Sequence, residues 1–198
     1  MAAGVLAMYN AFTVDETDRQ DIAASLSGDE AAFARLIERY ESAVASLAWR
    51  FAREPAAREE LVQDVFVEVY FSLDGYRGNA PFGHWLRRIA TRVGYRFWKR
   101  RSRASREVPL ADLDPPAAPG EMDPSAAGAA VHALLSHLPL PERLVLTLMY
   151  FEDCSVSEIA DRMGWTRAMV KMRAYRARRR LKAVAQREHL LERLGWTS

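Results

Sequence analysis

The sequence is poor in the residue types from which most enzyme sites are built. Its 198 residues include one cysteine, Cys154, and only four histidines, which are spread along the chain. A single cysteine excludes an internal disulfide framework and a multi-cysteine metal site, and the histidines match no metal-ligand spacing. The sequence also lacks a glycine-rich phosphate loop and a nucleophile–base motif. Cys154 follows Glu152 and Asp153, an acidic setting that disfavours the reactive thiolate. We therefore expect no enzymatic activity, no metal and no cofactor.

Long hydrophobic runs are missing as well. The longest apolar stretches fall far short of the roughly 20 residues that a membrane-spanning helix needs. Residues 1–12 contain no lysine or arginine and no adequate central apolar run, so they make a poor signal peptide. The hydrophobic share of 49% and the charged share of 27% are those of a folded globular protein. We expect one or two domains, a cytoplasmic location and no membrane insertion.

Acidic side chains are absent from two segments, although the net charge of the chain is only +2. Residues 87–106 and 162–182 each carry nine basic and no acidic side chains. By contrast, residues 1–86 have a net charge of −7 and residues 107–161 have −9. Two cationic blocks separated by acidic stretches indicate two contacts with a polyanion.

Apolar residues in the first half of the chain recur at intervals of three and four, which predicts amphipathic helices over about 29–53, 55–75 and 81–103. Residues 76–81 form a loop by their glycine, asparagine and proline content. The inward-facing residues expected in the first and third helices are Phe33, Leu36, Ile37, Tyr40, Val44, Leu47, Phe51, Phe82, Trp85, Leu86, Ile89, Val93 and Phe97. Residues 105–130 have no periodicity and contain five prolines, so they are a linker.

The second half predicts a helix that opens at Pro141, with Leu144, Leu148 and Phe151 facing inward. Ser155 and Glu158 form a capping box for a short helix, Gly164 supplies a turn, and Thr166 caps a long basic helix. Two helices joined by a tight turn, the second one basic, describe a helix-turn-helix. We expect an all-α protein of two small helical domains, 28–104 and 131–185, joined by the flexible linker 105–130 and flanked by an N-terminal extension (1–27) and a C-terminal tail (186–198).

Three helical faces are candidates for binding. The early cations of the last helix suit contacts to base edges and its later ones suit phosphates, the alternative being a solvated basic face. The helix from residue 82 places Arg88, Arg92, Tyr95 and Lys99 on one side, and such cations mixed with aromatic rings suit single-stranded nucleic acid. Trp98 lies on the flank of that face, where base stacking and core packing are equally open. The helix before it has an acidic face that would repel DNA, so it is either solvated or docks a basic protein.

These segments together resemble the extracytoplasmic-function sigma factors of bacterial RNA polymerase. Residues 60–66, ELVQDVF, look like the D-L-V-Q-E/D-V-F helix of the family's region 2. Residues 76–78 and 82–90, YRG and FGHWLRRIA, look like its F-R-G…F-x-x-W-L-x-R-I-A stretch. Leu138-Pro139, residues 155–160, and the runs VKMR and RAR from Val170 and Arg176 look like the signature of region 4. The resemblance covers most of the chain, over about 28–103 and 131–183.

The resemblance implies a role in transcription initiation, with core RNA polymerase (the clamp helices of the β′ subunit and the β flap) and promoter DNA as partners. It implies that the polymerase is bound by Glu60, Leu61, Gln63, Asp64 and Phe66. It implies that the −10 element is read as a single strand by Asn79, His84, Trp85, Arg88, Arg92, Tyr95, Arg96, Trp98 and Lys99. It implies that the −35 duplex is read by Thr166, Arg167, Lys171, Arg173, Arg176 and Arg178.

The chain departs from the family pattern at Arg92, where many members have asparagine, and at Met172, which replaces a serine. The first departure bears on the base preference at the −10 element, and the second alters either base contacts or only packing. Many members are held inactive by an anti-sigma factor, which is a further hypothetical partner here. The alternative reading is a stand-alone helix-turn-helix regulator, which accounts for residues 131–183 but leaves the first half of the chain without a role.

Overall fold

The computed structural model describes residues 16–107 and 131–187, and every regular element in these ranges is a helix. The chain divides into two compact units between Arg101 and Ser102. The predicted all-α fold is therefore confirmed. The ends of the chain and most of the predicted linker lie outside the described residues.

The first unit is built around three long helices: α3 (Glu30–Ala48), α4 (Pro55–Ser72) and α5 (Phe82–Glu107). The side chain of Asp29 caps α3 by accepting from the backbone N–H groups of Ala31 and Ala32. Pro55 stands in the first turn of α4, where its missing N–H costs no helical hydrogen bond. A short 3₁₀ turn, η1 (Leu73–Gly75), follows α4. Side chains that are fully buried in this unit include Leu36, Tyr40, Val44, Leu61, Val65, Val69, Phe82 and Leu86.

Two details of these helices differ from the prediction. Helix α3 ends at Ala48 rather than near residue 53, yet Phe51 beyond its end is still buried. The Phe51 ring packs against Trp98 of α5, with 4.7 Å between ring centroids. The side chain of Phe51 also covers Gly94, leaving no room there for a β-carbon. As a result α5 is buried over a wider arc than its apolar periodicity indicated.

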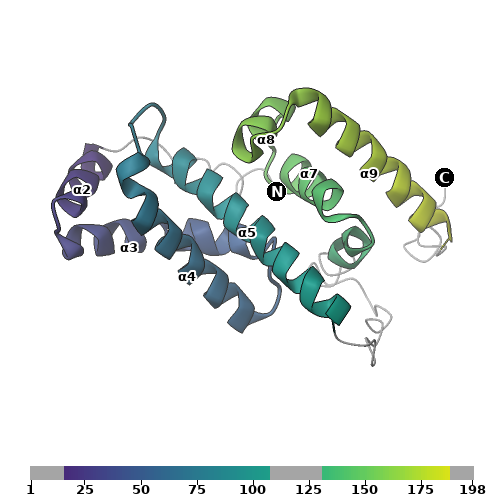
Figure 1. Ribbon diagram of the computed structural model, residues 1–198, viewed down its shortest axis with the longest axis horizontal. Coiled ribbons are helices and arrows are strands. Elements are labelled where there is room, and N and C mark those ends of the chain that lie inside the picture. The colour runs from purple at the N-terminus through teal and green to yellow at the C-terminus, as the bar shows by residue number, and fades with distance from the viewer. Residues whose placement is uncertain (1–15, 108–130, 188–198) are drawn as a thin grey trace. The chain divides into compact units, whose positions relative to one another are not determined.

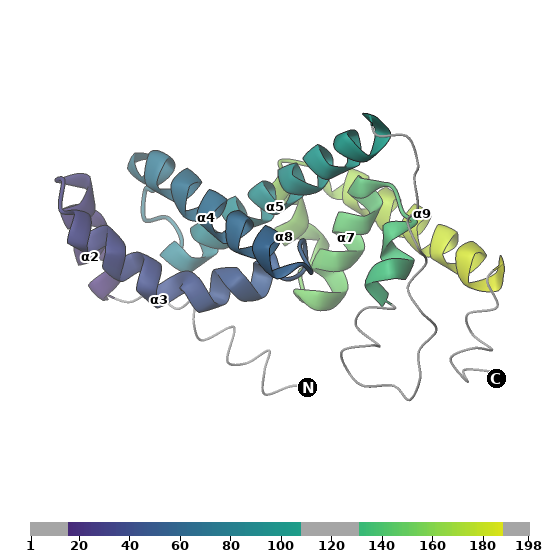
Figure 2. The same cartoon turned by 90° about the horizontal axis from the view of Figure 1, so that it is seen from below.

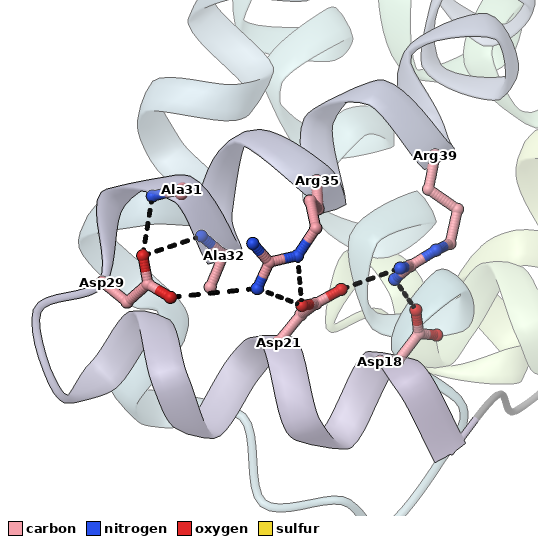
Figure 3. A network of polar contacts seen from close by, with 7 residues as sticks. All are labelled: Asp18, Asp21, Asp29, Ala31, Ala32, Arg35 and Arg39. Carbon is pink, nitrogen blue, oxygen red and sulfur yellow. Dashed lines mark hydrogen bonds and ion pairs between the residues drawn. The ribbon is translucent and has the colours of Figure 1, made fainter.

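Helix α2 (Glu16–Leu26) was not predicted, because all of it falls in the segment taken as an N-terminal extension. It packs beside α3 through ion pairs, as Figure 3 shows. The Arg39 guanidinium lies 2.6 Å from Asp18 and 2.7 Å from Asp21, and Arg35 lies 2.8 Å from Asp21. The Tyr40 hydroxyl donates to Asp18 at 2.6 Å. Both aspartates are buried, so α2 belongs to the packed first unit.

The second unit consists of a helical segment over 131–136 followed by α7 (Leu140–Phe151), α8 (Val156–Met163) and α9 (Arg167–Arg187). Helix α9 packs against both α7 and α8 (Figures 1 and 2). The core of this unit contains Leu144, Leu148, Ile159, Ala160, Val170, Ala174 and Ala177. Phe151 was expected inward but is 36% exposed, because it is the last residue of α7 and the chain turns away immediately after it.

Candidate functional site

The junction between α8 and α9 has the geometry of a helix-turn-helix, as predicted. Ser155 and Glu158 form the reciprocal capping box, with Ser155 Oγ accepting from the Glu158 N–H and Glu158 accepting from the Ser155 N–H. Gly164 ends α8 in the left-handed conformation, at φ 67°, which is easily reached without a β-carbon. Thr166 Oγ1 accepts from the Met169 N–H and so caps α9. The turn is therefore fixed by local hydrogen bonds at both helix ends.

The basic residues predicted for duplex DNA differ in their exposure along α9. Lys171, Arg176 and Arg178 are exposed. Arg167 is exposed but donates to Ser157 of α8 at 2.9 Å. The guanidinium of Arg173 stacks 3.8 Å from the centre of the Trp165 ring. Arg173 is only partly exposed, and its Nη1 is buried with no hydrogen-bond partner among the described residues.

A row of exposed cations runs along α5. Arg88, Arg92, Arg96 and Lys99 recur at intervals of four, four and three, which places them on one side of the helix. Desolvation, together with the positive charges of Arg88 and Arg96, lowers the pKa of the Arg92 guanidinium below its ordinary value. Like charges held this close repel one another, so the row gains stability when a polyanion binds across it.

Two aromatic residues of α5 were expected to contact bases but are buried. Trp98 is 4% exposed, its indole N–H donates to the Phe51 carbonyl at 2.8 Å, and its ring packs on Phe51. Tyr95 is 9% exposed, and the Lys99 ammonium lies 4.6 Å from the centre of its ring. Neither ring offers a face on which a base can stack. Trp98 and Tyr95 are therefore residues of the core in this structure, which does not favour the predicted contacts with bases.

The loop before α5 is held by its aromatic residue. The Tyr76 hydroxyl donates to the Ala80 carbonyl at 2.7 Å, and its ring packs against Phe82 and Trp85. Gly78 has φ 68°, which turns the chain sharply. Asn79 and His84 are exposed at this end of α5, and Trp85 is half-buried. The loop thus presents polar groups beside the first turn of the cationic row.

Helix α4 exposes only part of the set predicted to bind a partner. Leu61 and Phe66 are 1% and 8% exposed, so they belong to the core, and their burial does not favour the predicted contacts with a partner. Glu60 and Gln63 are exposed, whereas Asp64 is half-buried. Both residues lie in the run ELVQDVF that carries the family resemblance, and that motif alone could not separate packing from binding.

Sequence reasoning missed an exposed apolar patch on the same helix. Val67, Tyr70 and Phe71 are 56%, 53% and 78% exposed. Val67 and Phe71 border a groove of about 290 Å³ between α4 and α5. The signal was present in the sequence, since residues 65–71 are apolar except for Glu68, and a helix this rich in apolar residues must expose some of them.

Cations and carboxylates face each other across this groove, where α4 and α5 lie side by side (Figure 1). Arg100 lies 2.8 Å from Asp64, and Arg96 lies 2.6 Å from Glu68. The acidic face of α4 is therefore partly neutralised by Arg96 of the cationic row and by the neighbouring Arg100. Among the residues that the structure describes, no cluster of potential metal ligands occurs and no helix is long and apolar enough to cross a membrane.

Each of the two units matches the model of a known protein family. The profile of Sigma-70 region 2 matches residues 36–104, and the profile of Sigma-70, region 4, matches residues 128–181. The RNA polymerase sigma-H factor of Pseudomonas aeruginosa is 29% identical over 175 residues, covering 82% of this chain and 91% of that protein. The ECF RNA polymerase sigma-E factor of Escherichia coli K12 is 28% identical over 181 residues, covering 82% and 91%.

Two solved structures align with most of the chain. The structure of CnrH in complex with the cytosolic domain of CnrY aligns with a TM-score of 0.57 at 27% identity, covering 86% of this chain and 98% of that one. The sigma factor RpoE of Bartonella quintana, solved with the anti-sigma factor NepR, aligns with a TM-score of 0.55 at 22% identity, covering 78% and 96%. The second likeness shows the fold alone.

A helical region 2 and a helix-turn-helix region 4 in one chain define the sigma factors, the subunits that direct RNA polymerase to promoters. This chain belongs to the sigma-70 family, in its extracytoplasmic-function group. It is a polymerase-directing sigma factor rather than a stand-alone regulator, and it is not an enzyme.

Proposed function

We propose that the three surfaces divide the work of initiation, with α4 binding core polymerase, the loop 76–81 and α5 binding the −10 element, and α9 binding the −35 element. The protein acts in the cytoplasm, where polymerase and promoters are found. The observation that carries this division is the placement of charge. Helix α9 has no acidic residue, and α5 none before Glu107, whereas the exposed charged groups of α4 near its middle are acidic. DNA and a basic protein surface require these opposite signs.

On α5, the contacts to single-stranded DNA come from the exposed groups. Arg88, Arg92, Arg96 and Lys99 bind the phosphates, and Asn79 and His84 offer polar groups at the loop where a base turns out of the stack. Trp85 is the one aromatic residue of the predicted set that keeps partial exposure. Stacking on a base therefore falls to Trp85 rather than to Tyr95 or Trp98.

On α9, the helix-turn-helix presents the N-terminal half to the major groove. Lys171 and Arg176 lie on the exposed side of this half and supply hydrogen bonds to bases or phosphates. Thr166 and Arg167 stand at the helix start, and Arg178 lies further along, where backbone contacts prevail. Arg173 acts mainly by fixing the turn against Trp165, since its guanidinium is already stacked. The β flap of the polymerase is the protein partner for this unit.

On α4, docking to the clamp helices of the β′ subunit combines charge with apolar contact. Glu60, Gln63 and Asp64 supply the polar contacts, and Val67 and Phe71 supply apolar surface. An interface of exposed apolar residues rimmed by charged ones is typical of protein–protein contacts. An anti-sigma factor that covers the same apolar patch is a further proposed partner, because such a protein must compete with polymerase.

The experiment that tests this function is run-off transcription with bacterial core polymerase, with and without the protein, on its own upstream region. Protein-dependent transcripts from a fixed start support the proposal and supply the promoter sequence. Co-migration with core on gel filtration without a transcript would mean that the promoter is wrong. The absence of both a transcript and co-migration with core would overturn the proposal. A promoter fragment with a scrambled −35 sequence is the matched control.

A further inference from the structure

The side of α9 that points furthest from the core is apolar at its start. Val170, Ala174 and Ala177 are the buried residues of α9, at intervals of four and three, and are 0%, 2% and 0% exposed. Two residues correspond to about 200° around an α-helix, so positions shifted by two from this set lie on the opposite side. Those positions are occupied by Ala168, Met172 (51% exposed) and Tyr175 (59% exposed) in the first turns, and then by Arg176 and Arg179, all of them exposed.

Cations flank this apolar stripe on the exposed half of the helix. The exposed Lys171 lies to one side of Met172 and the partly exposed Arg173 to the other, each about 100° around the helix, and α9 contains no acidic residue at all. A protein partner that covers an apolar stripe between several cations must supply matching carboxylates at the rim. A DNA duplex supplies phosphates on both sides of a groove, which matches cations on both sides of the stripe.

The apolar residues occupy the part of a recognition helix that enters the major groove. Met172 and its neighbour Met169, 41% exposed, stand in the first two turns of α9. Their side chains have no group that donates to the acceptors of guanine, unlike arginine and lysine. The apolar group that the bases display in the major groove is the C5-methyl of thymine. The unbranched, flexible side chain of methionine adapts its shape to such a methyl group.

We propose that Met172 reads thymine in the −35 element by apolar contact with its methyl group. The inference rests on the proposed function of α9 and adds a base identity to it. In this arrangement Met172 distinguishes thymine from the other bases by shape and apolar burial, and the flanking cations provide affinity for the phosphates. Met169, one turn nearer the start of α9, adds apolar surface to the same contact in the major groove.

The test uses holoenzyme and the promoter identified by run-off transcription. Each thymine of the −35 footprint is replaced in turn by deoxyuridine, which removes only the methyl group. At one or two positions the wild-type holoenzyme should bind about two- to fivefold more weakly, the effect of one lost methyl burial. The Met172→Ala holoenzyme should bind thymine and deoxyuridine promoters equally, whereas Met172→Leu should keep most of the difference. All affinities are measured at one salt concentration.

Arg178→Ala serves as the matched control, because loss of a backbone cation should weaken both promoters by the same factor. Three results would overturn the inference: a −35 footprint without thymine, a wild-type affinity that no deoxyuridine changes, or a deoxyuridine effect that persists in Met172→Ala. Reduced polymerase binding by Met172→Ala with unchanged DNA affinity would overturn it too, and would assign the stripe to a protein. A holoenzyme with no protection of the −35 region at all would instead overturn the proposed function of α9.

Discussion

The carboxylate of Asp64 in α4 lies 2.8 Å from the guanidinium of Arg100 in α5. With the pair Glu68–Arg96, it connects the surface proposed for polymerase to the end of the surface proposed for DNA. The side chains of Asp64 and Arg100 are 38% and 59% exposed, so water screens the pair and its effect on folding is small. The ion pair therefore contributes little to the stability of the first unit. Its main effect is on the charge of the α4 surface that is proposed to bind polymerase.

Asp64→Ala should weaken holoenzyme assembly and leave the fold intact. We expect about fivefold weaker binding to core polymerase, because a polar contact is lost at the docking face. The free energy of unfolding should change by less than about 1 kcal/mol, since the pair is exposed. Competition binding to labelled core and urea unfolding measure the two quantities.

Glu41→Ala is the control for Asp64→Ala. Glu41 is an exposed acidic residue of α3, and its loss changes the net charge by the same amount. It should leave polymerase binding unchanged. If both variants weaken binding equally, the effect is one of net charge and Asp64 has no specific contact.

Gly94→Ala should destabilise the first unit, although alanine favours helices over glycine. A β-carbon at residue 94 would lie 2.5 Å from Cδ2 of Phe51, so the ring must move or the helix must shift. Overpacking of this kind costs about 1–3 kcal/mol, against a propensity gain of about 1 kcal/mol. Urea unfolding should therefore show a net loss of about 1 kcal/mol.

Phe51→Leu provides the background in which this explanation is tested. A smaller side chain at residue 51 relieves the contact, so Gly94→Ala should cost less in the Phe51→Leu protein than in the wild type. Stabilisation of the wild type by Gly94→Ala would show that the ring yields freely and that the close approach has no energetic weight.

These contacts mark the boundary of what the sequence could predict. The capping box at Ser155 and Glu158 and the turn at Gly164 are local, and sequence spacing alone was enough to place them. Trp98 was ambiguous because Phe51, which buries it, lies 47 residues away beyond the end of α3. The apolar periodicity of α5 alone cannot predict that contact. Burial of such residues is decided by tertiary packing rather than by the pattern of one helix.

The missed helix α2 illustrates the same limit for charged residues. Its buried side includes Asp18 and Asp21, which any hydrophobicity pattern assigns to solvent. Their burial makes sense only once Arg35 and Arg39 of α3 lie opposite. The same reasoning explains α4, where the motif residues Leu61 and Phe66 were taken as contacts with a partner although they form the core.

The contact between α2 and α3 should weaken in acid. Burial raises the pKa of Asp21, but hydrogen bonds from Arg39 and Arg35 lower it more, so the pKa lies below its ordinary value. A depressed pKa contributes stability above the unfolded pKa of about 3.9 and loses it as pH falls through the folded pKa. Asp21→Asn should cost about 1–3 kcal/mol at pH 6, and this difference from wild type should shrink below about pH 4.

Urea unfolding at pH 6, 5, 4 and 3 measures that difference. Asp74→Asn is the matched variant, since Asp74 is exposed in η1 and should show little cost at any pH. A cost for Asp21→Asn that stays constant down to pH 3 would mean that the carboxylate charge does not hold α2 on α3.

Arg173→Ala should weaken initiation that depends on the −35 element without affecting polymerase assembly. The guanidinium lies 3.8 Å from the Trp165 ring centre, so its loss removes a cation and also loosens the turn before α9. We expect about tenfold less transcript from the intact promoter and little change once the −35 sequence is scrambled. Arg173→Lys keeps the charge but not the planar stack, so it should recover only part of the activity.

Asp64→Ala should show the reverse division, with weaker assembly and unchanged −35 dependence. Equal loss of both activities in both variants would indicate general unfolding and would refute the assignment of separate roles to α4 and α9.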